Sequence, residues 1–372
     1  MRTFTFKGLL LTAVFMLLGC LSIQAADDDL ITKQITIKLD EAGTLPDRIG
    51  ASKKYLITNL KIIGKINGTD WKMIREMVGS GYENNKTAGK LSMLDLSEAK
   101  IVKGGDRYFS GYNCYTSNDE IGEYAFKDCS RLTSLTLPAG ITSIGYAAFN
   151  GCSGLTSLTL PAGITSIGRS TFEGCRGLTS LTLPAGITSI GGGAFKDCSG
   201  LTSLTLPAGI TSINYGTFYG CRGLTSLTLP AGITSIGYNA FYGCSGLTSL
   251  TLPAGITSIG EYAFRGCSGL TSIYVYSEKV PKMGTDVFKG CDANKCTVYV
   301  PKGTYDDYRL SEFGYFENIV EFDPTGIDKT TTSTDVEEVS RYSLNGQRLV
   351  GPTKGLNIVK YSDGSVKKVA VE

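Results

Sequence analysis

A segment of 13 residues returns almost unchanged through the middle of the chain, and its spacing restricts the possible folds more than any other feature. It reads L-T-S-L-T-L-P-A-G-I-T-S-I at residues 132–144 and begins again every 23 residues, the last copy being divergent, at Leu155, Leu178, Leu201, Leu224, Leu247 and Leu270. A fixed period of about 20–29 residues is typical of leucine-rich solenoids. The chain is therefore predicted to fold as a stack of similar coils.

The apolar residues of one repeat are spaced so that all of them can face the axis of the stack. With Leu132 as position 1, they fall at positions 1, 4, 6, 10, 13, 18 and 21, the last two being Phe and Cys. Leu135 and Leu137 alternate around a threonine and predict a short strand, whereas Phe149 and Cys152 are three apart and predict one tight helical turn. One coil cannot bury this set alone, but stacked coils can.

The full repeat, L-T-S-L-T-L-P-A-G-I-T-S-I-G-x-x-A-F-x-G-C, resembles the BspA-type leucine-rich repeats of bacterial surface proteins over about residues 121–300. The resemblance implies a right-handed leucine-rich repeat solenoid with a parallel β-sheet on one face and short helical or 3-10 turns and loops on the other. It also implies a non-catalytic adhesion protein, whose partners are host extracellular matrix proteins or other cell surfaces.

Residues 1–25 have the features of a secretory signal peptide. Two basic residues precede an apolar core and a region of small residues. Two processing routes remain open. Cleavage after Ala25 is one, and lipidation of Cys20 is the other, because the preceding residues resemble the lipobox of bacterial lipoproteins. Both routes take the chain out of the cytoplasm, so a secreted or outer-surface location is predicted.

Four further segments are predicted from changes in the sequence pattern. Residues 26–120 are expected to form an irregular, repeat-like N-terminal cap, with a helix that begins at Thr69 as its N-cap. Residues 121–322 are expected to form the solenoid and its C-terminal cap, and residues 323–338 a polar linker.

Residues 339–372 are predicted to form a small β segment of two hairpins, the first around Asn345-Gly346. This segment is similar to the C-terminal sorting domains of type IX secretion cargo, which implies export across the outer membrane followed by surface attachment or release. A membrane contact is therefore expected only through an anchor.

The composition argues against catalysis and against nucleic acid as a partner. The chain has no histidine, which removes the commonest general base and metal ligand, and its formal net charge is only +2. No catalytic motif or metal-binding cysteine pair is present, so no enzyme activity, cofactor or metal is expected. Eight of the 11 cysteines belong to the Phe-x-x-Cys series and are interpreted as buried free thiols. Cys291 and Cys296 are the one pair to test for a disulfide.

The first candidate surface is the outward face of the strands, where positions 3 and 5 of each repeat are Ser and Thr. These residues are expected to form hydroxyl ladders along the stack, beginning with Ser134, Thr136, Ser157, Thr159, Ser180 and Thr182. Two interpretations remain open. The residues supply solubility and β-propensity alone, or they form a flat platform that binds a glycan.

The second candidate surface lies where the copies differ. Positions 15 and 19 carry tyrosine in two consecutive coils, and neighbouring aromatic and arginine residues extend the set to Tyr215, Tyr219, Tyr238, Tyr242, Tyr262, Arg176 and Arg222. We expect four of these rings to cluster. Tyrosine and arginine dominate binding hot spots, although ordinary loop packing is the alternative. Three hypotheses result: protein adhesion through this patch, glycan binding on the strand face, or a passive surface spacer.

Overall fold

The computed structural model describes residues 29–110 and 114–324, together with residues 338–343, 348–349, 351, 354–361 and 366–371 of the C-terminal part. The predicted signal peptide, Cys20 and residues 325–337 of the predicted linker lie outside these ranges. Within the described residues, no helix combines the length and the apolar composition that a membrane crossing requires.

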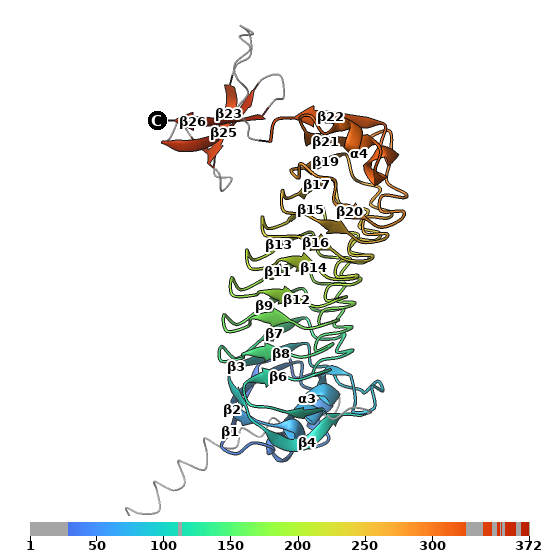
Figure 1. The fold of residues 1–372 in the computed structure, drawn as a ribbon. Helices are drawn as coiled ribbons and strands as arrows, with labels where there is room; N and C mark the ends of the chain where they lie inside the picture. Colours follow the sequence, from blue (N-terminus) through green and yellow to red (C-terminus); the bar gives the residue numbers. More distant parts are fainter. Residues whose placement is uncertain are drawn as a thin grey trace, which may run out of the picture.

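The repeats fold into stacked coils, as the sequence predicts, and Figure 1 shows them as a continuous solenoid. The first strand of each coil is short, buried at its leucine and exposed at the flanking Ser and Thr. Adjacent strands are parallel and in register, so that Leu158 lies beside Leu181. This first column comprises β7 (Ser134–Thr136), β9 (Ser157–Thr159), β11 (Ser180–Thr182), β13 (Ser203–Thr205), β15 (Ser226–Thr228), β17 (Ser249–Leu252), β19 (Ser272–Val275), β21 (Thr297–Pro301) and β22 (Asn318–Phe322).

A second column of parallel strands adds to the single sheet that the sequence suggested. It forms because positions 12 and 13 are also extended, with the isoleucine buried and the serine outward. The column comprises β6 (Glu120–Ile121), β8 (Ser143–Ile144), β10 (Ser166–Ile167), β12 (Ser189–Ile190), β14 (Ser212–Ile213), β16 (Ser235–Ile236), β18 (Ser258–Ile259) and β20 (Lys282–Met283). Each coil therefore presents two strand faces to solvent.

The predicted helical turn around Phe149 and Cys152 is a series of tight turns instead. The N–H of Cys152 donates to the carbonyl of Phe149 in its own coil (3.1 Å), but the N–H of Phe149 donates to the carbonyl of Thr171 in the next coil (2.9 Å). A helix would use both N–H groups within one coil. The left-handed conformation of position 16, with φ of 49° at Ala147 and 57° at Tyr262, turns the chain so that the bonds to the next coil can form.

The core is a set of columns in which identical residues stack. The phenylalanine rings from Phe126 to Phe288 lie parallel to one another, with neighbouring centroids 5.0–5.8 Å apart. Each is almost fully buried. Burial of one such side chain contributes about 1.5–3 kcal/mol before the entropy of ordering is counted.

The cysteine column serves as a hydrogen-bond donor as well as an apolar filler. Cys175 Sγ lies 3.1 Å from the carbonyl oxygen of Phe149 in the coil before it, and the same contact recurs at the corresponding cysteines. All ten cysteines of the described residues are buried and free, which confirms the interpretation of the column. Cys291 and Cys296 are among them, so this structure contains no disulfide between the pair that we singled out.

The N-terminal region continues the first column, because β1, β2 and β3 pair in parallel with one another and β3 pairs with β7. Its elements are β1 (Ile35–Leu39), α2 (Leu45–Ile49), η1 (Lys53–Tyr55), β2 (Asn59–Ile66), α3 (Gly68–Val78), β3 (Met93–Ile101), β4 (Gly104–Phe109) and β5 (Cys114–Thr116). The N-cap of α3 is Asn67 and not Thr69 as expected, because Asn67 and Asp70 exchange capping hydrogen bonds.

Helix α3 covers the first coil through two buried side chains. Trp71 Nε1 donates to the carbonyl of Ala125 (2.9 Å), and the guanidinium of Arg75 donates to the carbonyl of Tyr124 (2.8 Å) and to Ser80 Oγ (2.9 Å). Within the described residues no carboxylate pairs with Arg75. Backbone carbonyls therefore accept most of the hydrogen bonds that this buried guanidinium donates.

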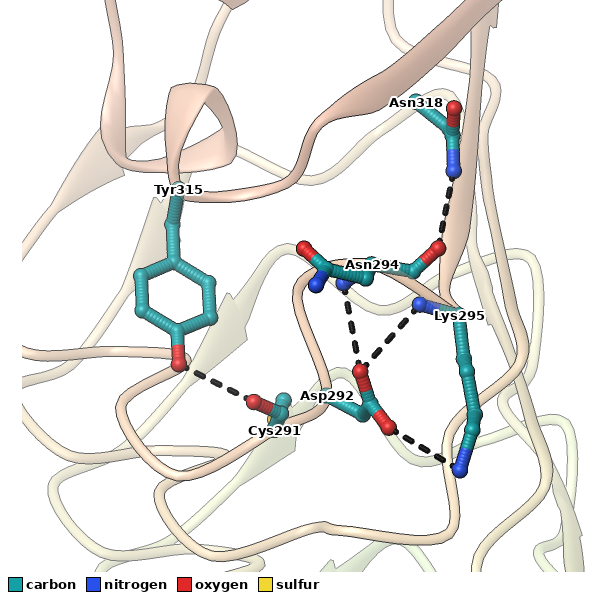
Figure 2. Close-up of polar contacts among 6 residues, drawn as sticks. All are labelled: Cys291, Asp292, Asn294, Lys295, Tyr315 and Asn318. Carbon is teal, nitrogen blue, oxygen red and sulfur yellow. Dashed lines mark hydrogen bonds and ion pairs between the residues drawn. The ribbon is translucent and has the colours of Figure 1, made fainter.

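The last coil is closed by α4 (Tyr305–Arg309) and η2 (Glu312–Tyr315). Figure 2 shows the loop beneath them, in which the Asp292 carboxylate accepts from the N–H groups of Asn294 and Lys295 (both 3.2 Å). Its hydrogen bond with the Lys295 side chain lowers the pKa of Asp292. Tyr315 Oη donates to the carbonyl of Cys291 (2.9 Å) and ties the closing segment to the loop.

The C-terminal segment contains the two predicted hairpins and joins them into one antiparallel sheet of order β24-β23-β25-β26. The strands are β23 (Glu338–Ser343), β24 (Arg348–Leu349), β25 (Gly355–Tyr361) and β26 (Val366–Val371). Residues 344–347, which include the predicted Asn345-Gly346 turn, lie outside the described residues.

The cysteine column predicts a specific chemical inertness. Burial raises the pKa of the Cys175 thiol to about 12 and that of Cys198 well above its usual value, so neither forms thiolate at pH 8. We expect iodoacetamide to leave the column cysteines unmodified in the native protein and to alkylate them all in urea, as measured by peptide mass spectrometry. Native alkylation at Cys175 or Cys198 would contradict the buried column.

The contacts of Arg75 predict a large loss of stability on truncation. Arg75→Met removes the donor to the backbone carbonyls of Tyr124, Ala125 and Gly81 and to Ser80 Oγ, so we expect the free energy of unfolding to fall by roughly 2–4 kcal/mol. Arg48→Met, at an exposed arginine of α2, is the control and should change it by less than about 0.5 kcal/mol. Urea unfolding followed by the fluorescence of Trp71, the single tryptophan, measures both. Equal midpoints for the two variants would contradict this role.

Candidate binding surfaces

The five tyrosines of the second candidate surface, which we call the tyrosine ridge, form two ring pairs and not one cluster of four. Tyr219 and Tyr242 stack face to face with centroids 4.8 Å apart, and Tyr238 meets Tyr262 edge to face at 5.8 Å. Each pair joins neighbouring coils. Residues at positions 15 and 19 of one coil do not pair, because the buried phenylalanine at position 18 and the turn at position 16 lie between them.

The fifth ring, that of Tyr215, lies back over the two preceding coils. It occupies the space above Gly192, where an added Cβ would lie 2.3 Å from the ring. Beyond Gly192 the ring reaches Arg169, whose guanidinium carbon is 5.2 Å from the ring centroid. Tyr215 and Tyr238 are the most exposed of the five, at 45% and 48%.

The cations beside the tyrosine ridge are not the two arginines that the sequence suggested. Arg265 lies over Tyr262 (5.2 Å) and Lys196 over Tyr219 (5.9 Å), in addition to Arg169 over Tyr215. The Lys196 ammonium donates a hydrogen bond to the Glu173 carboxylate (2.9 Å), which raises the pKa of Lys196 and keeps the lysine charged. These three cations occupy positions 15 and 19 of nearby coils, and a comparison of those positions coil by coil could have found them.

Arg176 and Arg222 line two other hollows, and neither is among the cations that lie over a ring of the ridge. Both side chains are exposed. The ridge itself adjoins a shallow groove of ≈500 Å³ along the second strand column, which is lined by Asn214, Tyr215 and Lys282 among others. The expected patch is thus divided between the ridge and these hollows, and the two adjoin where the N–H of Asp197 donates to the carbonyl of Tyr219 (2.7 Å).

The strand face has the expected exposed Ser and Thr residues, but other threonines make the hydroxyl ladders. Thr179 Oγ1, at position 2, donates to the carbonyl of Thr156 one coil earlier (3.2 Å), and Thr257 Oγ1, at position 11, donates to that of Thr234 (2.8 Å). Within the described residues, no side-chain hydrogen bond is formed by the six predicted residues Ser134, Thr136, Ser157, Thr159, Ser180 and Thr182. Their hydroxyls are exposed and available to a ligand.

An aromatic surface, which sequence reasoning missed, ends the strand face. The register that aligns the position-5 threonines continues from Thr251 to Tyr274 and then to Tyr299, whose rings stack at 4.5 Å. Phe322 meets both Tyr274 and Tyr276 edge to face. We call Tyr274, Tyr276, Tyr299 and Phe322 the aromatic end. A hollow of ≈570 Å³ adjoins it at Tyr276. The sequence does contain a signal for this surface, because the divergent copy has Tyr274 where the other copies have threonine.

Metal ligands do not gather anywhere in the ranges that the structure describes, since no group of three Cys, Asp or Glu side chains could hold an ion there. The fold defines a leucine-rich repeat solenoid. The family model for the BspA type leucine rich repeat region matches six copies, over residues 119–246 and 188–308, which together span just over half of the chain. The chain belongs to this family of repeat proteins, and the family model that matches describes the repeat region alone.

Several solved structures are similar to the chain. A leucine-rich repeat protein from Bacteroides ovatus is 23% identical, with a TM-score of 0.48 over 66% of this chain and 64% of that one. The T. pallidum leucine-rich repeat protein is 29% identical (TM-score 0.39, 44% and 75% covered), and the pneumococcal vaccine antigen PcpA is 18% identical (0.38, 72% and 80%). The chain spans just under two thirds of the length of the first. No curated protein matches the sequence.

Proposed function

We propose that the protein is a non-catalytic binding protein of the bacterial cell surface and that the tyrosine ridge contacts a protein partner. The observation that carries the proposal is a row of tyrosines on successive coils, two pairs of them in ring contact and two of the rings exposed, with cations beside them. Host extracellular matrix proteins, or proteins of another cell surface, are the partners that the family suggests.

The geometry of the ridge supports a binding role. Tyrosine and arginine are enriched at interface hot spots because they bury a large area and donate hydrogen bonds as well. The stacking of Tyr219 on Tyr242 already restricts both side chains, so a partner would lose less conformational entropy on binding. The exposed rings of Tyr215 and Tyr238 supply the apolar area.

Display at the surface is part of the same proposal. Residues 1–25 would direct export, with cleavage after Ala25 or lipidation of Cys20. Residues 26–120 would cap the solenoid of residues 121–322, and residues 323–338 would link it to the C-terminal segment. That segment, residues 339–372, would act as a type IX sorting or anchoring unit, and its antiparallel hairpins are compatible with such a role.

A second candidate function is glycan binding along the strand face. The observation that favours it is the column of exposed position-5 threonines, which ends in register at the aromatic end. Tyr299 stacks on one side of Tyr274, and the in-register neighbour on the other side is the small Thr251. An aromatic ring beside a flat hydroxyl surface suits the apolar face and the hydroxyl edge of a sugar ring.

The adhesion hypothesis predicts the effect of removing the exposed rings. Tyr215→Ala combined with Tyr238→Ala should weaken binding to a panel of purified extracellular matrix proteins by at least about tenfold, measured by biolayer interferometry. Because both side chains are nearly half exposed, the unfolding midpoint should hardly change. Adding Tyr219→Phe and Tyr242→Phe then tests whether the hydroxyl groups of these two tyrosines contribute to binding, because phenylalanine keeps the two stacked rings.

The matched control is Tyr115→Ala with Tyr305→Ala, two exposed tyrosines outside the ridge. This variant should bind like the unaltered protein. If all variants bind equally, the ridge is not the contact surface. If deletion of one whole 23-residue unit also has no effect on binding, the passive spacer remains the better explanation.

The glycan hypothesis predicts a different pattern on a glycan array. Hits should weaken at least about fivefold with Thr159→Val and Thr182→Val, which remove hydroxyls at nearly constant volume, and with Tyr274→Leu. Thr165→Val with Thr211→Val, two exposed threonines directly before strands of the second column, is the control. An array without hits, or hits that are indifferent to the first set, would refute a sugar site on the strand face.

A further inference from the structure

A polar groove of ≈780 Å³ lies where the N-terminal region meets the first coils. One wall is the segment that follows α3, from Gly79 to Thr87, and the other wall is the edge of three successive coils. The lining consists of Gly, Ser, Thr, Asn, Asp, Lys and Arg residues and includes no apolar side chain. Neither the tyrosine ridge nor the strand face contributes to it.

Three exposed cations line this groove: Lys86, Arg131 and Arg176. Among the described residues none of the three forms an ion pair. The side chain of Arg131 packs over Gly79, where an added Cβ would lie 3.1 Å from Arg131 Cδ. The one carboxylate of the lining, Asp128, accepts a hydrogen bond from Asn84 (2.8 Å).

The row of cations continues along the stack. Arg176 also lines a second hollow, of ≈240 Å³, together with Arg222 and Asp197. Arg176 and Arg222 occupy the same position in coils two apart, which corresponds to about 10 Å at the usual spacing of strands. The two hollows together hold four cations against two carboxylates, so the combined surface is basic.

We propose that this basic groove binds an acidic polysaccharide, a sugar chain that carries carboxylate or sulfate groups. Arginines placed along an axis suit a polymer with anions at regular intervals, because each guanidinium can donate two parallel hydrogen bonds to a carboxylate or sulfate. The hydroxyls and amides between them suit the hydroxyl groups of the sugar rings.

Two other polyanions fit the lining less well. An acidic peptide normally fixes itself with apolar anchors in pockets, and this groove has no apolar side chain to receive them. A single-stranded nucleic acid stacks its bases on aromatic rings, and no aromatic residue lines the groove. The polysaccharide uses only hydrogen bonds and charge, which are what the groove offers.

The test measures binding of the full chain to heparin, polygalacturonate and neutral dextran by isothermal titration calorimetry. We expect binding to the first or second polymer, none to dextran, and weakening as NaCl rises, because the cations are exposed and salt screens them. The triple variant Arg131→Gln, Arg176→Gln and Arg222→Gln should raise the Kd roughly tenfold or more.

The control variant Lys53→Gln, Lys100→Gln and Lys302→Gln removes the same charge from exposed positions outside the groove, and its Kd should stay within about twofold. Equal weakening by both triple variants would mean that net charge alone drives binding and would overturn the proposal. So would the absence of binding to either acidic polymer, or equally tight binding of poly-glutamate. Tyr215→Ala with Tyr238→Ala should leave heparin binding unchanged, so this test and that of the tyrosine ridge can fail separately.

Discussion

The structure depends on one constraint: a single 23-residue coil has seven apolar side chains and no second layer to bury them. Only a neighbouring coil can cover Leu158, Phe172 or Cys175, and the stacked rings and the S–H···O=C bonds are made between coils. Because every coil buries its apolar side chains against the next coil in the same way, each residue lies beside its counterpart one repeat away. The exact periodicity of the sequence is thus converted into straight columns.

Columns also determine where a binding surface can form. Two tyrosines 23 residues apart, such as Tyr219 and Tyr242, become neighbours, whereas two tyrosines four residues apart in one coil do not. The same rule places Tyr274 against Tyr299 at the end of a threonine column and aligns Arg176 with Arg222 along one edge. Three chemically distinct surfaces, one aromatic and cationic, one rich in hydroxyls and one basic, can therefore form on one solenoid.

The sequence was sufficient for the solenoid, the inward residues and the buried thiols, because each follows from period and polarity alone. It could not give the second strand column, since a two-residue strand such as Ser143–Ile144 has no pattern of its own and exists through its neighbours. The helical spacing of Phe149 and Cys152 misled for the same reason, as the backbone bonds of that segment run to the next coil. The contact between Tyr215 and Arg169 was not predicted either. It forms because the coil between them has Gly192 at this position, so it depends on the residues of three coils.

The left-handed residue at position 16 has a wider consequence. Ala147, Ser170, Asn239 and Tyr262 all adopt this conformation, although only glycine and asparagine favour it. The hydrogen bonds between coils impose the backbone shape whatever the side chain, so the fold does not select the residue there. Residues on the outer edge of one coil can consequently be substituted without any change in the packing of the core. The same scaffold can therefore acquire a new specificity by a few point substitutions in a single repeat.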